Sequence, residues 1–130
     1  MTADDSTHAG LRHWAKGNYA LEAGVELLIR PFHGRFAGAW QPWVEPGDGD
    51  GVWWIDPEKF DIGALSGGER RLLSVAESLL GGQPVDLAEA LPGMDRECVE
   101  LVLAAVSHAS GSHEHYGAGI PLHPWPALDS

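Results

Sequence analysis

The sequence contains very little cysteine and no long hydrophobic run. Cys98 is the single cysteine among the 130 residues, so no disulfide can form within the chain. The longest uninterrupted apolar run, Leu101 to Val106, is far too short to cross a bilayer. The opening residues, MTADDSTHAG, have neither the basic segment nor the apolar segment of a secretory signal. We therefore expect a soluble protein of the cytoplasm.

Positive charge is also scarce. The chain has 8 lysines and arginines against 19 aspartates and glutamates, which gives a formal net charge of −11 at pH 7. The excess of negative charge is largest in residues 40–64, which contain six acidic residues and one basic residue, Lys59. A surface of this sign repels phosphate backbones and anionic lipid headgroups. We therefore expect the chain to bind neither nucleic acid nor a membrane directly.

What is present indicates a folded, mainly helical protein. The length suits one domain over residues 1–130, and the apolar fraction of 44% is enough for a core. In residues 11–30 apolar side chains recur at spacings of three, four and seven, and Pro31 ends the run. We expect a single compact, mainly α domain of four to five helices. We expect residues 1–6 and 117–130 to be extended or partly disordered, the second as a proline-rich strap.

The segment LSGGERRLLSVAESLL, residues 65–80, resembles the signature helix of ATP-binding cassette and related chromosome-maintenance ATPases. The resemblance implies an action on nucleotide held by another subunit. Those ATPases also need a phosphate-binding loop, G-x-x-x-x-G-K-[ST], and neither lysine of this chain follows such a glycine pattern. The same letters form a capping box, in which Ser66 and Glu69 satisfy free backbone N–H groups at a helix start. We interpret the segment as a helix start.

The same local chemistry predicts further helix boundaries. Gly81-Gly82 supplies the left-handed conformation that ends the helix after the capping box. Asp86 with Glu89 predicts a capped short helix over Leu87–Leu91, and Asp95 predicts the cap of a last helix. We expect that last helix to bury Val99, Val102, Leu103 and Val106.

Tryptophan is unusually frequent, and the residues around it predict a β-hairpin. The segments QPWVE and VWWID flank PGDGDG, whose residues tolerate positive φ, so we expect a hairpin over about residues 40–56. Adjacent Trp53 and Trp54 must point to opposite faces of a strand. The outward one needs either a cover, such as Trp125 in the strap, or a binding partner.

The hairpin therefore carries the predicted binding surface. Exposed aromatic anchors with an acidic rim suit a basic protein partner, and a second copy of the chain is the other candidate. The function that this predicts is a non-catalytic interaction module, such as an inhibitor, an immunity-type protein or an accessory subunit. The predicted surface consists of Trp40, Trp43, Trp53, Trp54, Asp48 and Asp50.

Histidine indicates an alternative function. Seven histidines are many for this length, and His108, His113 and His115 lie close together in the sequence. In an extended segment His113 and His115 point the same way, and with His108 they can ligate Zn²⁺. The alternative function is thus a small metal- or ligand-binding protein. The competing interpretation is that His108 complements the dipole at a helix end, with the other two in solvent and no cofactor bound.

The sequence predicts no catalytic residues. Cys98 and His108 are ten residues apart on one expected helix, about 15 Å along its axis, so they cannot act together. There is no G-x-S-x-G nucleophile motif. The stretch GDGDG does not continue as a calcium loop, because Lys59 stands where the twelfth position needs glutamate. The chain is better explained as a protein that is not an enzyme.

Overall fold

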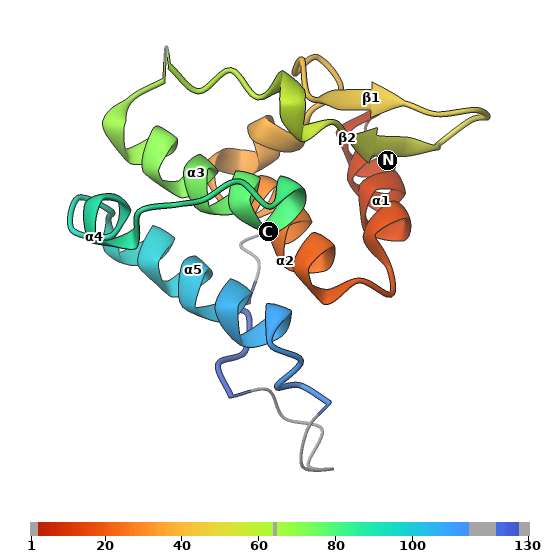
Figure 1. Ribbon diagram of the computed structural model, residues 1–130. Coiled ribbons are helices and arrows are strands. Elements are labelled where there is room, and N and C mark those ends of the chain that lie inside the picture. The colour runs from red at the N-terminus through yellow and green to blue at the C-terminus, as the bar shows by residue number, and fades with distance from the viewer. Residues whose placement is uncertain (1–2, 64, 115–121, 128–130) are drawn as a thin grey trace.

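The computed structural model describes residues 3–63, 65–114 and 122–127, and within them the protein is mainly helical. Five α-helices pack together, and one short hairpin lies at the edge of the molecule beside α1, which confirms the expected fold class (Figure 1). None of the helices in these residues is long and apolar enough to cross a membrane. In chain order the elements are α1 (Ala3–Ala15), α2 (Tyr19–Ile29), η1 (Phe32–Ala37), β1 (Val44–Pro46), β2 (Trp53–Ile55), η2 (Pro57–Lys59), α3 (Gly67–Gly81), α4 (Leu87–Ala90) and α5 (Arg96–Ala109).

Helix α2 lies at the centre of the molecule. Helices α1, α3 and α5 and the short helix η1 all contact it, and Figure 1 shows it between α1 on one side and α3 and α5 on the other. Its sequence, YALEAGVELLI, is apolar on most sides, as a helix surrounded by others must be. Val25, Leu27 and Leu28 have no exposed surface. The core is therefore built around α2.

The predicted hairpin is present, with strands that are shorter than its sequence range. Strands β1 and β2 pair antiparallel, with Val44 opposite Ile55 and Glu45 opposite Trp54. Val44 and Ile55 are buried in the core. Because successive side chains of a strand alternate between its faces, Glu45 and Trp54 face outward. The alternation thus decides which tryptophan of the adjacent pair turns away from the core.

Helix α1 and the hairpin approach each other closely at Gly10. A Cβ atom at this position would lie 2.5 Å from the backbone oxygen of Gly51 and 2.7 Å from Cδ1 of Trp53. Either distance is a clash, so only glycine allows this packing. Gly68, in the first turn of α3, has no atom within 4 Å of the same hypothetical position. The two glycines thus form a matched pair of one crowded and one open helical site.

We expect Gly10→Ala to destabilise the protein by about 1–3 kcal/mol, because the added methyl group must push the hairpin away. This loss outweighs the gain of up to ~1 kcal/mol that alanine brings to a helix. Gly68→Ala is expected to leave the free energy of unfolding unchanged or slightly higher. Urea denaturation of both variants provides the measurement. Equal effects of the two substitutions would contradict the close packing at Gly10.

The helix boundaries confirm most of the predicted caps. Ser66 Oγ accepts from the N–H of Glu69 at 3.3 Å, and a Glu69 carboxylate oxygen accepts from the N–H of Ser66 at 3.2 Å. Gly82 ends α3 in the left-handed conformation. Asp95 caps α5 by accepting from the N–H of Cys98. The prediction for Asp86 is wrong in its detail, because its side chain makes no capping bond and α4 runs only over Leu87–Ala90.

The prediction of the buried face of α5 is partly wrong. Leu103 is 50% exposed and Val106 56% exposed, whereas Val102 is buried as expected. Instead, Leu101 and Ala105 face inward, where α5 packs on α2 and α3. The helix carries apolar residues on several sides. The sequence pattern alone could not select between these faces.

The two ends of the chain differ from each other. Residues 3–6 belong to α1, so the expectation of an extended start is wrong there, while residues 1–2 lie outside the described part. At the other end, residues 122–127 form neither helix nor strand, as a strap would, and residues 117–121 and 128–130 lie outside the description. Trp125 packs against the core. Arg30 fixes this strap by donating to the carbonyl of Pro126 at 2.8 Å and lying over the Trp125 ring.

Candidate functional site

The polar residues at the start of the signature-like segment have structural roles. Ser66 and Glu69 form the capping box, and the Glu69 carboxylate also pairs with Arg35. The capping bonds and the ion pair thus engage the Ser66 hydroxyl and the Glu69 carboxylate. The interpretation of this segment as a helix start is therefore confirmed.

The structure divides the predicted tryptophan surface into buried and exposed residues. Trp43 is 1% exposed, and its Nε1–H donates to the carbonyl of Phe36 at 2.7 Å. Its ring packs between Phe36 and Phe60. The prediction that Trp43 contacts a partner is therefore wrong, because it is part of the core. Trp53 is half-buried, while Trp54 is 38% and Trp40 64% exposed.

A groove lies between α1 and the outer part of the hairpin, with a volume of about 520 Å³. We call it the hairpin groove. Ala9, Gly10 and Trp14 line it from α1, and Val52, Trp53 and Trp54 line it from the hairpin. Most of its lining is apolar, and three tryptophans meet there. Concave apolar surfaces of this kind bind ligands or partner segments.

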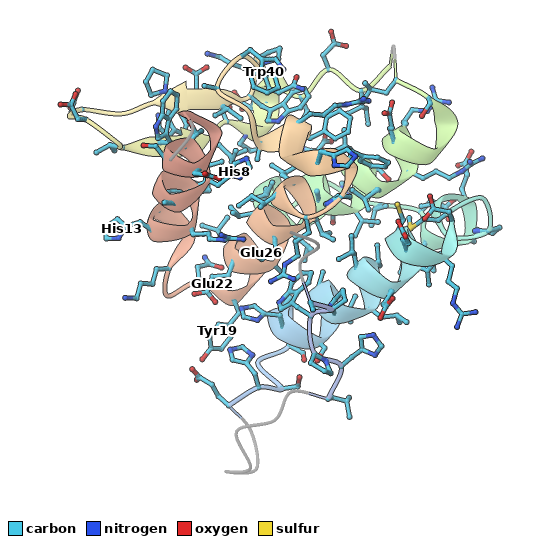
Figure 2. All side chains as sticks on the ribbon, turned by 180° about the vertical axis from the view of Figure 1, so that it is seen from behind. His8, His13, Tyr19, Glu22, Glu26 and Trp40 are labelled. Carbon is cyan, nitrogen blue, oxygen red and sulfur yellow. The ribbon has the colours of Figure 1, made fainter. Side chains whose placement is uncertain are left out.

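The acidic residues predicted for the surface lie beside this groove. Asp48 and Asp50 are exposed in the turn between the strands, next to Gly51 and Val52 of the groove lining. Glu45, in contrast, pairs with Lys59. Trp40 does not line the groove, although Figure 2 places it at the same end of the molecule as the hairpin.

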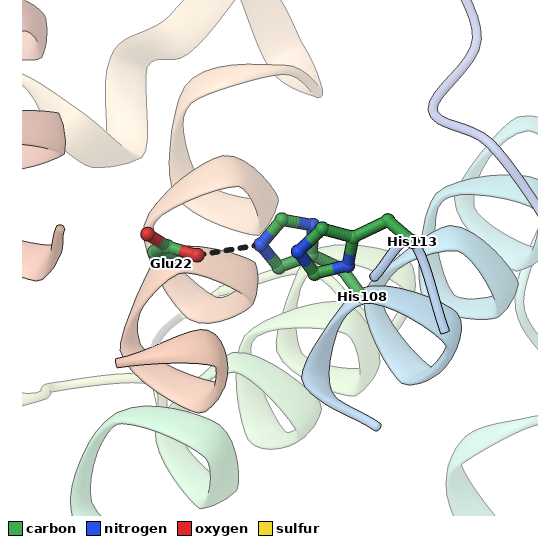
Figure 3. Close-up of side chains that lie close together, drawn as sticks. All are labelled: Glu22, His108 and His113. Carbon is green, nitrogen blue, oxygen red and sulfur yellow. Dashed lines mark hydrogen bonds and ion pairs between the residues drawn. The ribbon is translucent and has the colours of Figure 1, made fainter. Parts of the chain in front are cut away.

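A second group of functional side chains gathers where α2 meets the end of α5. Glu22, His108 and His113 each offer one possible metal-ligand atom, and these atoms lie within 4.8 Å of one another. We call these three residues the His–Glu cluster. Figure 3 shows both imidazole rings turned toward the Glu22 carboxylate. His108 and His113 are thus brought together as predicted, and His115 lies outside the described residues.

The contacts within the cluster are close. His108 Nε2 lies 2.7 Å from Glu22 Oε1, and the rings of His108 and His113 stack with centroids 4.1 Å apart. The other Glu22 oxygen accepts from the N–H of Gly17 at 3.0 Å. Burial acts to raise the pKa of Glu22, but the bonds from His108 and Gly17 outweigh it and hold this pKa below its ordinary value. Glu22 is therefore ionised at neutral pH.

Two aromatic side chains flank the cluster. The Tyr19 ring meets the His113 ring edge-on, with centroids 4.7 Å apart. The Tyr19 hydroxyl donates to Glu114, and this bond raises the pKa of Tyr19. On the other side, the centroid of the Trp125 ring lies 6.2 Å from the centroid of the His108 ring. These rings restrict the positions open to the imidazoles.

The cluster opens onto a smaller pocket of about 320 Å³, which we call the basic pocket. Arg12, Lys16 and Arg30 line it together with Glu22 and His108 of the cluster. Its other acidic lining residue is Glu26, which pairs with Arg12 and Arg30 at 2.8 Å each. Burial acts to raise the pKa of Glu26, but its two arginine partners outweigh it and hold the pKa below the ordinary value.

Nucleophilic chemistry at the one cysteine is disfavoured. Cys98 is buried in the core, and burial raises the pKa of its thiol to about 12. A thiol with such a pKa carries almost no thiolate at neutral pH and is a poor nucleophile. The side chain therefore serves as a small apolar group.

Two contributions to these sites were not predicted from the sequence: Glu22 in the His–Glu cluster, and α1 as one wall of the hairpin groove. Glu22 lies 86 residues before His108, and no spacing rule connects residues so far apart. Gly10 was a weak indication of the groove wall formed by α1. A glycine within a helical segment often marks a place where another element approaches closely. Comparisons with protein-family models, with curated proteins and with solved structures found no match.

Proposed function

We propose that this protein is a non-catalytic interaction module that binds a partner protein through the hairpin groove. The observation that carries the proposal is the groove itself, where Trp14, Trp53 and Trp54 meet on one concave apolar surface. Tryptophan is enriched among residues that dominate binding energy, because it buries a large area with few rotatable bonds. Trp40 is also exposed at this end of the molecule (Figure 2), but it does not line the groove.

The acidic turn beside the groove indicates the chemistry of the partner. Asp48 and Asp50 are exposed next to the groove, on a chain with net charge −11. Opposite charges guide association and fix orientation, while desolvated apolar contacts supply most of the affinity. The partner segment that fits has an apolar or aromatic anchor beside lysine or arginine. A second copy of this chain fits less well, since the copies would repel each other.

A displayed library of random peptides, selected on the immobilised protein, tests this proposal. Enriched peptides are expected to carry an apolar anchor beside basic residues. For a selected peptide, Trp54→Ala should weaken binding roughly ten-fold or more, as loss of a central anchor does. Asp48→Asn with Asp50→Asn should weaken it less and reduce its salt dependence. Calorimetry at two salt concentrations measures both effects.

Trp40→Ala is the matched control for Trp54→Ala. It removes the same kind of side chain, which is more exposed but does not line the groove, so a smaller loss of affinity is expected. Enrichment of acidic peptides, or binding that Trp54→Ala leaves unchanged, would contradict the proposal. Sedimentation of the free protein distinguishes partner binding from self-association.

A further inference from the structure

We infer that Glu22, His108 and His113 form a binding site for a divalent transition-metal ion, for which Zn²⁺ is the best match. Their possible ligand atoms already lie within 4.8 Å of one another. They come from the first turn of α2, the last turn of α5 and the turn that follows α5. The site is independent of the proposed function, since none of its residues lines the hairpin groove.

Stacking contacts, and no hydrogen bond at Nδ1, position the His113 ring in the described residues. Nδ1 of His113 is buried and has no hydrogen-bond partner in the described residues. The ring is instead held by stacking, between His108 on its face and the edge of Tyr19.

The donor types select the kind of ion. Imidazole nitrogen and carboxylate oxygen are ordinary zinc ligands, at about 2.0–2.2 Å from the metal. Calcium and magnesium need more oxygen ligands than one carboxylate provides. Cobalt, nickel and copper also accept imidazole, so Co²⁺ is a useful spectroscopic substitute.

Metal binding requires a small rearrangement of the two rings. Ligands of a tetrahedral zinc ion lie about 3.3 Å apart, given those bond lengths. The present rings are almost parallel, at 7°, so an ion in the plane of one ring lies out of the plane of the other. His113 must therefore tilt out of the stack. Glu22 needs less change, because the N–H of Gly17 already orients its carboxylate, as outer-shell donors do in metal sites.

Three protein ligands leave one tetrahedral position free, and the basic pocket provides access to it. Glu22 and His108 line both the cluster and this pocket. The pocket also presents Arg12, Lys16 and Arg30. Glu26 pairs with both arginines, so Lys16 is the lining cation with no ion pair in the described residues, and water or hydroxide can take the fourth position. This arrangement resembles an open metal site more than a closed structural one.

The test uses the full, untagged chain, made metal-free and titrated with ZnCl₂ in competition with a chromophoric chelator. One equivalent of Zn²⁺ is expected to bind. His113→Ala and Glu22→Gln should each lower the affinity about 100-fold or more, since even outer-shell changes cost 10–100-fold. His13→Ala, which removes an exposed histidine of α1 outside the cluster, should change it less than three-fold. Circular dichroism verifies that each variant is folded.

Cobalt provides a second readout that a purely structural role of these residues would not produce. Co²⁺ bound at the site should show the visible bands of tetrahedral coordination, and His113→Ala should remove them. Absence of stoichiometric Zn²⁺ binding would overturn the inference. Retention of binding in both His113→Ala and Glu22→Gln would do the same, as would a loss caused only by His115→Ala. Peptide binding at the hairpin groove should be unaffected by Zn²⁺, so the two proposals can fail separately.

Discussion

Replacing Trp43 by alanine is expected to lower the free energy of unfolding by about 4 kcal/mol, because removing a buried aromatic side chain leaves a large cavity. The ring has almost no exposed surface and packs between Phe36 and Phe60. The substitution also removes the donor to the Phe36 carbonyl. Such a loss is a large part of the 5–15 kcal/mol that stabilises a typical domain. Urea denaturation followed by circular dichroism measures it.

Two further tryptophan substitutions, Trp40→Ala and Trp43→Phe, make this prediction specific. Trp40→Ala should change stability by less than about 0.5 kcal/mol, because that side chain is largely in solvent. Trp43→Phe should cost about 1–2 kcal/mol, since the ring remains but the Phe36 carbonyl loses its donor. If Trp43→Ala were no more harmful than Trp40→Ala, the position of Trp43 in the core would be refuted.

Glu26→Gln is expected to destabilise the protein by about 2–3 kcal/mol. The carboxylate lies between Arg12 and Arg30, and its side chain is 15% exposed. Removing one partner of a buried ion pair leaves the other charge without compensation, which costs about 3–5 kcal/mol in full burial. The expected loss is below this range because Arg12 is partly in solvent, which screens its charge. Thermal and urea unfolding at pH 7 measure the difference.

The effect of Glu26→Gln should depend on pH in a defined direction. The arginines hold the folded-state pKa of Glu26 below its ordinary value of 4.5 despite burial. A carboxylate with a lowered pKa contributes stability above its unfolded pKa and loses it as the pH falls through the folded pKa. The difference between the two proteins should therefore be largest above pH 4.5 and shrink below it. Glu100→Gln, on the exposed side of α5, should show no comparable pH dependence.

Glu26 also connects the stability of the fold to the basic pocket. Its partner Arg30 donates to Pro126 and lies over Trp125, and Trp125 in turn lies beside His108. Loss of the Glu26 charge would thus loosen the strap beside the His–Glu cluster. Figure 2 shows Glu22 and Glu26 one turn apart on α2, at a distance from Trp40. Hydrogen exchange of residues 122–127 in Glu26→Gln would report such loosening.

The local structure could be predicted well from the sequence, because it depends on neighbouring residues. The capping box of Ser66 and Glu69, the glycine end of α3 and the Asp95 cap each need only a few consecutive residues. The hairpin followed from its turn residues and its alternating strands. Asp86 shows the limit of this reasoning, since a suitable residue type does not guarantee that its side chain makes the bond.

The choice among similar side chains required the tertiary structure. Trp43 and Trp54 stand in comparable local sequences, yet one packs between two phenylalanines and the other faces outward. The buried face of α5 was ambiguous for the same reason, because apolar residues cover more of that helix than its neighbours can bury.

By itself, the sequence determined the fold class, most helix ends, the hairpin and the pair His108 and His113. Only the tertiary structure added Glu22 to that pair and placed α1 opposite the hairpin. The physical reason is the range of the interactions: caps and turns form between residues a few positions apart. A groove or a ligand cluster forms between residues that packing of the core brings together, and one sequence pattern is compatible with several such packings.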